Sequence, residues 1–376
     1  MRGGTRAPDL HERIATAAWG CAAGSSADEF PAASLFQFQA KRIPPYAAYL
    51  EYLGVDAAHM VDWHNIPLVP ASAFKSHDLS AAPPEVDGRP GSPGVVFETS
   101  GTTVSRPGRV RLGDTRLYEA SLLRSFERHL LPDGARLRAV VFGPSRDEAP
   151  RSSLWFMVDR VVREFAPDPD TAPRVMRDGE PRWDLADEAL ARAEAAREPL
   201  LLLGTTLFFM AYFERLATLG RSFVLPAGSR AMDTGGAKGL RAEFAREAVA
   251  SAFEHSLGIP ATHLVNEYGM AELGSQFYDD ALLAHQEGRA PKAGKQIPPW
   301  VRTRVLDPET MEEVADGERG LLVHYDLANL EIPLAIQTED IGSRTGDRLH
   351  LEGRLLGSEP RGCSLTFERF LAEKPA

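Results

Sequence analysis

A hydroxyl-rich loop at residues 98–109 is the part of the sequence whose residue types most directly suggest chemistry. It lies between the apolar residues 95–97 and the strand-like residues 110–112, and it reads Glu-Thr-Ser-Gly-Thr-Thr-Val-Ser-Arg-Pro-Gly-Arg. A glycine flanked by hydroxyls and followed by arginines can bind polyphosphate oxygens through backbone N–H groups, O–H donors and guanidinium groups. It is not a Walker loop, because no Gly-Lys-Ser/Thr follows at the required spacing. The pattern predicts a phosphate-binding loop, with an ordinary Ser/Thr turn as the alternative.

A second candidate segment, residues 266–272, contains both an aromatic ring and a carboxylate. It reads Asn-Glu-Tyr-Gly-Met-Ala-Glu and follows a predicted strand. A purine needs a flat apolar face and Mg²⁺ needs hard oxygen ligands, so Tyr268 and Glu272 suit these two roles. Upstream, Gly235 and Gly236 stand in a loop where glycine lets a purine edge approach the backbone closely. The alternatives are a plain surface turn for the first segment and a helix-entry loop for the second.

Taken in order, these segments resemble the motifs of the adenylate-forming (ANL, acyl-CoA synthetase-like) superfamily. The first is similar to the Thr-Ser-Gly-Thr-Thr loop that holds the β- and γ-phosphates of ATP. The family usually continues with Gly, any residue, Pro and Lys, whereas this chain has Val104 to Gly108, and we expect Arg106 or Arg109 to supply the charge. The resemblance implies a phosphate site formed by Thr99, Ser100, Gly101, Thr102, Thr103 and Arg106.

Residues 268–272 resemble the Tyr-Gly-any-Thr-Glu motif of the same superfamily, with Ala271 in place of the usual Thr. The resemblance implies that Tyr268 stacks on adenine and that Glu272 binds Mg²⁺. In this chain the hydroxyl that normally lies near the α-phosphate is absent. The resemblance implies that the adenine pocket is lined by Gly235, Gly236, Ala237, Tyr268 and Gly269.

A third element, Thr338 to Gly342, resembles the superfamily element whose Asp binds the ribose hydroxyls. One carboxylate can accept both protons of two vicinal hydroxyls. Asp340 is preferred over Asp347 because it follows the apolar residues 332–336, whereas Asp347 falls in the turn of a predicted hairpin. Gly353-Arg354 resembles the hinge that ends the large domain, and we expect Arg354 to be a catalytic residue together with Glu272.

The residues after the hinge narrow the resemblance to one branch. Few residues follow Arg354, so we expect a body that lacks the usual mobile C-terminal domain and its lysine. Whether a partner subunit supplies this lysine is left open by the sequence. Residues 73–75, 151–154 and 361–365 resemble the acyl-protein synthetases of bacterial luminescence (LuxE type). Members of that family activate a fatty acid with ATP, move the acyl group to a cysteine near their C-terminus and pass it to an acyl reductase.

Cys363 is the acyl acceptor that this resemblance implies. A thiolate is a good nucleophile toward an acyl phosphate anhydride, and the neighbouring Arg361 would lower the pKa of the thiol. The alternative is a buried small hydrophobic residue. Cys21, among alanine and glycine, is interpreted as structural.

An α/β fold must position these residues. Short apolar strands alternate with helical periods between Leu137 and Glu267, which predicts a parallel sheet with crossover helices and ligands at the strand ends. The predicted strands are Leu137–Phe142, Leu200–Leu203, Phe223–Leu225 and His263–Asn266, and the predicted helices are Tyr46–Leu53, Trp183–Arg197 and Leu240–Leu257. The pattern then becomes antiparallel, at Val301–Leu306, Gly320–Tyr325 and Arg348–Leu351.

Four segments follow from these patterns. They are an N-terminal wrapping segment at residues 1–94, an α/β adenylate-forming core at 95–299, a small antiparallel β region at 300–354 and a short tail at 355–376. An acyl pocket is assigned to Phe208 and Phe209, although aromatics at helical spacing are more often core.

Composition excludes several classes of protein. A chain of 376 residues with 43% hydrophobic residues can bury a substantial core. The formal net charge of -11, with both signs interspersed, argues against nucleic-acid binding, which needs a basic face. The two cysteines form no disulfide framework or zinc site, and neither an export signal nor a membrane span stands out, so we expect a cytoplasmic location.

Three functions remain open on the sequence. The first is ATP- and Mg²⁺-dependent activation of a carboxylic acid, expected to be a fatty acid, to acyl-AMP, with transfer to Cys363 or a protein acceptor such as an acyl reductase. The second keeps adenylation but transfers the acyl group to coenzyme A or a carrier protein, as relatives of phenylacetate-CoA ligase do. The third is a non-catalytic module that binds a nucleotide or acyl-adenylate.

Overall fold

The computed structural model describes residues 31–89, 92–99, 107–235 and 246–354, which divide into two compact units. Unit 1 contains the described residues up to Ser121, together with Met270–Ser275 and those from Ile297 onward. Unit 2 contains Leu122–Gly269 and Gln276–Gln296. Helix α4 (Arg116–Leu130) is divided between the units after Ser121. The four segment boundaries expected from the sequence stay predictions.

A mixed sheet forms the centre of unit 2, in the strand order β11-β10-β9-β8-β7-β4. Four neighbouring strands are parallel: β4 (Arg138–Phe142), β7 (Leu200–Thr205), β8 (Arg230–Thr234) and β9 (Leu264–Tyr268). The short strands β10 (Phe277–Tyr278) and β11 (Lys295–Gln296) are antiparallel to their neighbours. The expected parallel α/β sheet is therefore present in the middle of the chain.

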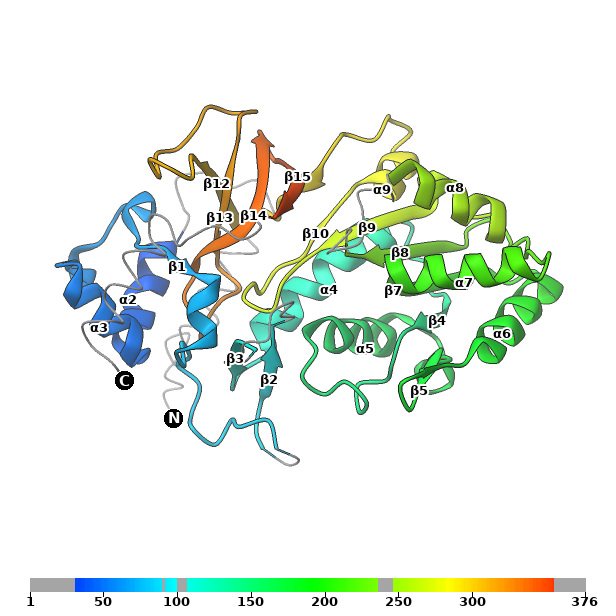
Figure 1. The fold of residues 1–376 in the computed structure, drawn as a ribbon, viewed down its shortest axis with the longest axis horizontal. Coiled ribbons are helices and arrows are strands. Elements are labelled where there is room, and N and C mark those ends of the chain that lie inside the picture. The colour runs from blue at the N-terminus through cyan, green and yellow to red at the C-terminus, as the bar shows by residue number, and fades with distance from the viewer. Residues whose placement is uncertain (1–30, 90–91, 100–106, 236–245, 355–376) are drawn as a thin grey trace, which may run out of the picture. The chain divides into compact units, whose positions relative to one another are not determined.

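Helices cover this sheet because its strands are apolar on both faces, as is typical of buried parallel strands. Leu200 and Leu202 point into a core shared with α6 (Trp183–Ala196), α7 (Thr206–Thr218) and α8 (Arg246–Leu257). Figure 1 shows these three helices running alongside the strands. The remaining elements of unit 2 are α5 (Ser153–Phe165), η4 (Pro169–Thr171), β5 (Met176–Arg177), β6 (Glu180–Pro181), η5 (Ala261–His263) and α9 (Ala281–Gln286).

One predicted strand of this sheet is wrong. Phe223–Leu225 is apolar and buried but forms no strand, and the strand of this region is β8, a few residues later. The backbone N–H groups of Phe223 and Leu225 donate instead to Ser256 O at 2.9 Å and Leu257 O at 3.0 Å, at the end of α8. A helix end has unpaired carbonyls that can accept such bonds. The predicted helix Leu240–Leu257 is described from Arg246 onward.

Antiparallel strands dominate the second half of unit 1, as expected. Strands β12 (Val301–Leu306), β13 (Arg319–Asp326), β14 (Ala335–Thr345) and β15 (Arg348–Arg354) pair in chain order. Asp347 lies in the tight turn between β14 and β15, as predicted. The rest of unit 1 comprises α2 (Ala32–Arg42), α3 (Pro44–Tyr52), η1 (Ala57–His59), η2 (Trp63–Asn65), β1 (Val69–Pro70), η3 (Ala71–Lys75), β2 (Val95–Glu98) and β3 (Arg109–Leu112).

The first residues of unit 1 pack on this antiparallel sheet. Strand β1 pairs in parallel with β14, Val69 opposite Ile336. The side chain of Gln39 in α2 is fully buried and bonds to the connection between β13 and β14. None of the helices in the described ranges combines the length and apolar character needed to cross a bilayer.

Candidate functional site

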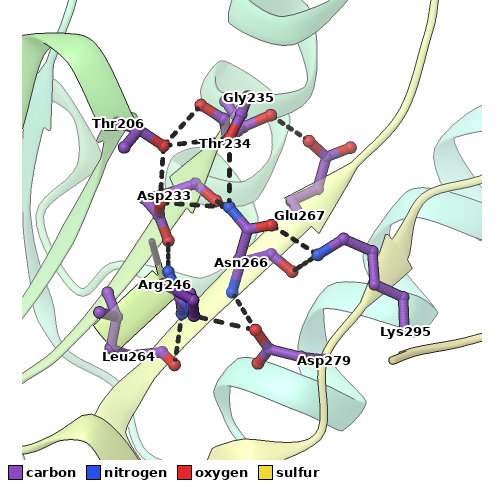
Figure 2. A network of polar contacts seen from close by, with 10 residues as sticks. All are labelled: Thr206, Asp233, Thr234, Gly235, Arg246, Leu264, Asn266, Glu267, Asp279 and Lys295. Carbon is purple, nitrogen blue, oxygen red and sulfur yellow. Dashed lines mark hydrogen bonds and ion pairs between the residues drawn. The ribbon is translucent and has the colours of Figure 1, made fainter. Parts of the chain in front are cut away.

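Polar side chains converge at the carboxyl ends of β7, β8 and β9 in unit 2 (Figure 2). Parallel strands that end together bring the residues that follow them to one edge, which is where such sheets bind ligands. The register sets Asp233 of β8 opposite Asn266 of β9. The next β8 residues lead into Gly235, and the next β9 residues lead to Tyr268. The two predicted walls of the adenine site therefore leave adjacent strands.

Asp233 is the centre of this network. Its side chain is 1% exposed and accepts hydrogen bonds from Thr206 Oγ1 at 2.7 Å, Arg246 at 2.6 Å and Asn266 Nδ2 at 3.1 Å. Buried carboxylates are stable only when paired in this way. Thr206 also approaches the carbonyl oxygens of Thr234 and Gly235, at 3.3 and 3.1 Å. The start of the glycine loop is thus held by the first side chain of α7.

Lys295 holds the neighbouring strand end. Its Nζ donates to the carbonyl oxygen of Asn266 at 2.8 Å and to the Oδ1 of the same residue at 2.6 Å (Figure 2). Burial lowers the pKa of the Lys295 amino group from its usual range, while Asp279 and other nearby carboxylates act to raise it. Asp279 in turn accepts from the backbone N–H of Asn266 at 2.9 Å. Asn266 is therefore held at its backbone and at its side chain.

Tyr268 ends β9 two residues beyond Asn266. It is half-buried, and its ring lies 5.6 Å from that of Phe277, its register partner in β10, at an angle of 58°. Glu267, next to it, accepts a hydrogen bond from the hydroxyl of Thr234 on β8. This bond links the strand that carries Tyr268 directly to the strand that leads to Gly235. Gly269 follows Tyr268 in the same unit.

The predicted carboxylates Glu272 and Asp340 both belong to unit 1 and are nearly buried, at 5% and 6% exposure. Asp340 accepts a 2.8 Å hydrogen bond from Arg354 Nε. Its backbone N–H donates to Thr338 Oγ1 at 3.0 Å. The competing Asp347 has a side chain that is 59% exposed in the β14–β15 turn. The structure thus brings Asp340 together with Arg354 and leaves Asp347 at the surface.

His324 on β13 lies near enough to Asp340 for the carboxylate to act on its imidazole. It is fully buried, and burial lowers the pKa of its imidazole to about 4, although the Asp340 carboxylate acts in the opposite direction. A ring nitrogen lies 2.9 Å from Thr303 Oγ1. His324 is consequently neutral near pH 7.

Thr99 lies at the base of the predicted phosphate loop, between β2 and β3. Its backbone N–H donates to Gly108 O at 2.9 Å, and its Oγ1 accepts from Gly108 N at 3.0 Å. The two ends of the loop are thereby held together, and Arg109 lies 3.7 Å from Glu98 across the hairpin. The loop residues Ser100, Gly101, Thr102, Thr103 and Arg106 lie outside the described residues, as do Gly236, Ala237 and Cys363.

The aromatic residues assigned to the acyl pocket pack in the interior of unit 2. Phe209 is fully buried, and its ring lies 4.6 Å from Phe142 and 4.8 Å from Phe253. Phe208 is partly buried against Trp183, with ring centroids 5.0 Å apart. These contacts give Phe209 a packing role, and the acyl-pocket assignment stays a prediction.

Sequence reasoning missed Asp233, Arg246 and Lys295 as part of this site. Asp233 and Arg246 flank the glycine loop, so their proximity to the strand ends was a usable signal. Lys295 lies in a short strand within a stretch rich in Gly and Pro, where no periodicity marks a buried position. Its role appears only when β11 is placed in the sheet.

No cluster of His, Cys, Asp and Glu among the described residues could by itself hold a metal ion. Mg²⁺ in nucleotide sites is usually bound by one or two carboxylates together with substrate phosphates. A single nearly buried carboxylate, Glu272, fits that donor set.

Comparison with solved structures gives the class of fold. The chain resembles an open conformation of 2-hydroxyisobutyryl-CoA ligase in complex with 2-HIB-AMP and CoA, with a TM-score of 0.60. The two sequences are 17% identical, and the match covers 86% of this chain and 73% of the ligase. The same ligase in its thioesterification state matches with a TM-score of 0.57 and 15% identity over 92% of this chain and 68% of that one. The fold is therefore a mixed α/β body of the adenylate-forming ligase type.

The chain belongs to the LuxE acyl-protein synthetase family, whose model matches residues 41–372, and it is accordingly a ligase. A long-chain-fatty-acid–luciferin-component ligase of Vibrio harveyi is 25% identical over 357 residues, covering 90% of this chain and 86% of the relative. The ligase of the same description from Aliivibrio fischeri is 33% identical over 108 residues, or 26% of each protein. The resemblance to the LuxE family predicted from the motifs is confirmed, and the fold is similar to that of solved adenylate-forming ligases.

Proposed function

We propose that this ligase activates a fatty acid with ATP and transfers the acyl group through an enzyme cysteine. In the first step a carboxylate oxygen attacks the α-phosphorus of ATP, the bond to the β-phosphate bridge breaks, and pyrophosphate leaves. The product is acyl-AMP. In the second step the thiolate of Cys363 attacks the acyl carbon and AMP leaves with the electron pair of the broken C–O bond. The names of both bacterial relatives support a fatty acid as substrate.

One observation carries the nucleotide part of this proposal. The Thr234–Glu267 and Asn266–Asp233 hydrogen bonds tie together the two strand ends that lead to Gly235 and Tyr268. A flat ring beside a glycine backbone suits a purine, and its position at a carboxyl edge suits a ligand site. We assign adenine to this edge, ribose to Asp340 and the phosphates to residues 99–106.

Glu272 is assigned to Mg²⁺. The ion supplies charge neutralisation for the phosphates and the departing pyrophosphate when it is bound. Arg354 is assigned the catalytic role predicted from the sequence, and its ion pair with Asp340 also balances the charge of that carboxylate. The resulting thioester keeps enough free energy for onward transfer to a protein acceptor such as an acyl reductase.

A pyrophosphate-release screen tests the adenylation step. Fatty acids of increasing chain length and a set of aromatic acids are offered with ATP and Mg²⁺. We expect release that depends on a long-chain fatty acid. Release with aromatic acids alone would contradict the substrate class, and release that needs coenzyme A would favour a CoA ligase.

Covalent labelling tests the second step. Cys363→Ser is expected to abolish acyl labelling of the protein by a radiolabelled fatty acid while leaving pyrophosphate release in place. Cys21→Ser is the matched control, because it removes the other cysteine of the chain. Labelling that survives in Cys363→Ser would overturn the cysteine step.

A further inference from the structure

We propose that Asn329 is a positioning residue that fixes the backbone of residues 270–275 and thereby aims the carboxylate of Glu272. This inference rests on the proposed function only in the role it gives to Glu272. The segment is a short turn, with Leu273 N donating to Met270 O at 3.2 Å. Such a turn needs outside contacts to hold one conformation.

The amide of Asn329 binds the backbone at Glu272 itself and again two residues later, at Gly274. Its Nδ2 donates to the carbonyl oxygen of Glu272 at 3.0 Å, and its Oδ1 accepts from the backbone N–H of Gly274 at 2.7 Å. The second Nδ2 proton goes to Pro333 O, at 3.1 Å. Asn329 is 1% exposed, so water does not compete for these bonds. An amide offers two donors and one acceptor group, and all are used.

Close packing reinforces these hydrogen bonds. A Cβ added to Gly274 would meet the backbone carbon and oxygen of Ala328 at 2.8 Å, closer than real Cβ contacts. Only glycine lets the turn lie this close to residues 326–329. Ser275 Oγ adds a hydrogen bond of 2.8 Å to Asp326 Oδ1, which also accepts from Ala328 N at 2.9 Å. The turn that carries Glu272 is thus attached at two consecutive residues.

Asn329 is itself held from the N-terminal region. Gln39 of α2, fully buried, donates to Asn329 O at 2.5 Å and to Ile332 O at 2.6 Å, and accepts from Leu334 N at 3.0 Å. The contacts therefore run from α2 through the β13–β14 connection to the turn of Glu272. We call Gln39, Asp326 and Asn329 the carboxylate clamp.

A precisely held ligand is what metal-assisted chemistry requires. Residues that hold the ligands of a metal commonly change metal affinity roughly ten- to a hundredfold when replaced. The carboxylate clamp has the features of such a support, because its members are buried and do not occupy the ligand position. Its loss affects Glu272 without removing a carboxylate.

Three variants test the inference. Asn329→Ala removes the side-chain bonds to Glu272 O and Gly274 N, and Gln39→Leu removes the bond to Asn329 O at similar side-chain volume. Asn65→Ala, which changes an exposed asparagine of the same unit, is the control. The Mg²⁺ concentration for half-maximal ATP–pyrophosphate exchange should rise roughly tenfold or more in Asn329→Ala, less in Gln39→Leu, and not in Asn65→Ala. The KM for the acid should stay close to wild type. The inference is overturned if the activity of Asn329→Ala falls only in proportion to its folded fraction and its half-maximal Mg²⁺ concentration is unchanged. Asn329 would then have only a structural role.

Hydrogen exchange of the free protein supplies a readout that needs no activity. In Asn329→Ala the Gly274 amide should lose protection while amides of β12 keep theirs. Unchanged protection at Gly274 overturns the inference, whether or not the enzyme is active. If the wild-type chain shows no acid-dependent exchange but Gly274 loses protection, the proposed function fails and the clamp stands.

Discussion

Arg354 Nε donates a hydrogen bond of 2.8 Å to Asp340 Oδ1, and the two residues are register partners in β15 and β14. The carboxylate predicted for ribose and the arginine predicted at the hinge therefore form one ion pair, in which Asp340 is the more buried member. A charge-assisted hydrogen bond of this kind fixes the direction of the carboxylate. The ribose role predicted for Asp340 can be tested by substitution.

Asp340→Asn should raise the KM for ATP roughly ten- to a hundredfold, because the ribose hydroxyls lose a charged acceptor worth roughly 1.5–3 kcal/mol. Asp347→Asn is the matched control, since its side chain is 59% exposed in the adjacent turn. Steady-state kinetics with varied ATP makes the comparison. A larger effect of Asp347→Asn would transfer the ribose role to the turn.

Tyr268→Ala should weaken ATP binding about tenfold, because loss of a stacked ring costs roughly 1–2 kcal/mol. Tyr268→Phe keeps the ring and its contact with Phe277, so its affinity should remain close to wild type. Fluorescence titration with an ATP analogue measures both. Equal losses in the two variants would show that the hydroxyl, rather than the ring, matters.

Lys295→Met should lower the free energy of unfolding by about 2–4 kcal/mol. The substitution leaves two partly buried oxygens of Asn266 without their charged donor, while the Met side chain largely replaces the methylene stem. Lys292→Met alters an exposed lysine nearby and should change stability by less than about 0.5 kcal/mol. Urea unfolding compares them. If Lys295→Met leaves the free energy of unfolding unchanged, the cost of burying the amino group offsets the stabilisation from its hydrogen bonds.

Acid should destabilise the protein through His324. Burial lowers the pKa of His324 to about 4 in the folded chain, below the usual value of 6.5. The unfolded chain therefore takes up this proton first. The stability contribution is fully present above the unfolded pKa and is lost as pH falls through the folded pKa, amounting to about 3 kcal/mol.

The control for this pH dependence is a pair of histidine variants. His324→Gln should remove the contribution of His324 to the fall in the free energy of unfolding between about pH 7 and about pH 4. His255→Gln, at an exposed position, should keep it. Urea midpoints at the two pH values supply the measurement. If the urea midpoint of His324→Gln falls with pH as much as that of the wild type, other groups cause the loss of stability in acid.

Local patterns were enough to predict much of this fold. Alternating apolar strands and helices indicated the parallel sheet, and turn residues indicated the β14–β15 hairpin around Asp347. Phe223–Leu225 was misassigned because an apolar run shows burial, while only tertiary contacts decide whether its N–H groups meet a strand or the end of α8. Asn329 and Gln39 gave no local signal, since their bonding partners lie far away in the chain.

Site residues that belong to short sequence motifs could be predicted, whereas residues that hold them through tertiary contacts could not. Tyr268, Glu272 and Asp340 were found from short motifs, and their roles stay predictions. Lys295, Asp233 and Arg246 were missed because a lone charged residue usually lies on the surface. The burial of Asp233 and Lys295 is explained only by their bonds to Arg246 and Asn266.

The central claim is that the chain forms acyl-AMP, and acid-dependent ATP–pyrophosphate exchange tests it most directly. Radiolabelled pyrophosphate is incubated with the protein, ATP, Mg²⁺ and a long-chain fatty acid in the absence of coenzyme A. We predict label in ATP only when the fatty acid is present, and a large loss of label in Glu272→Gln. No label with any acid, or products that are ADP and phosphate, would contradict the account.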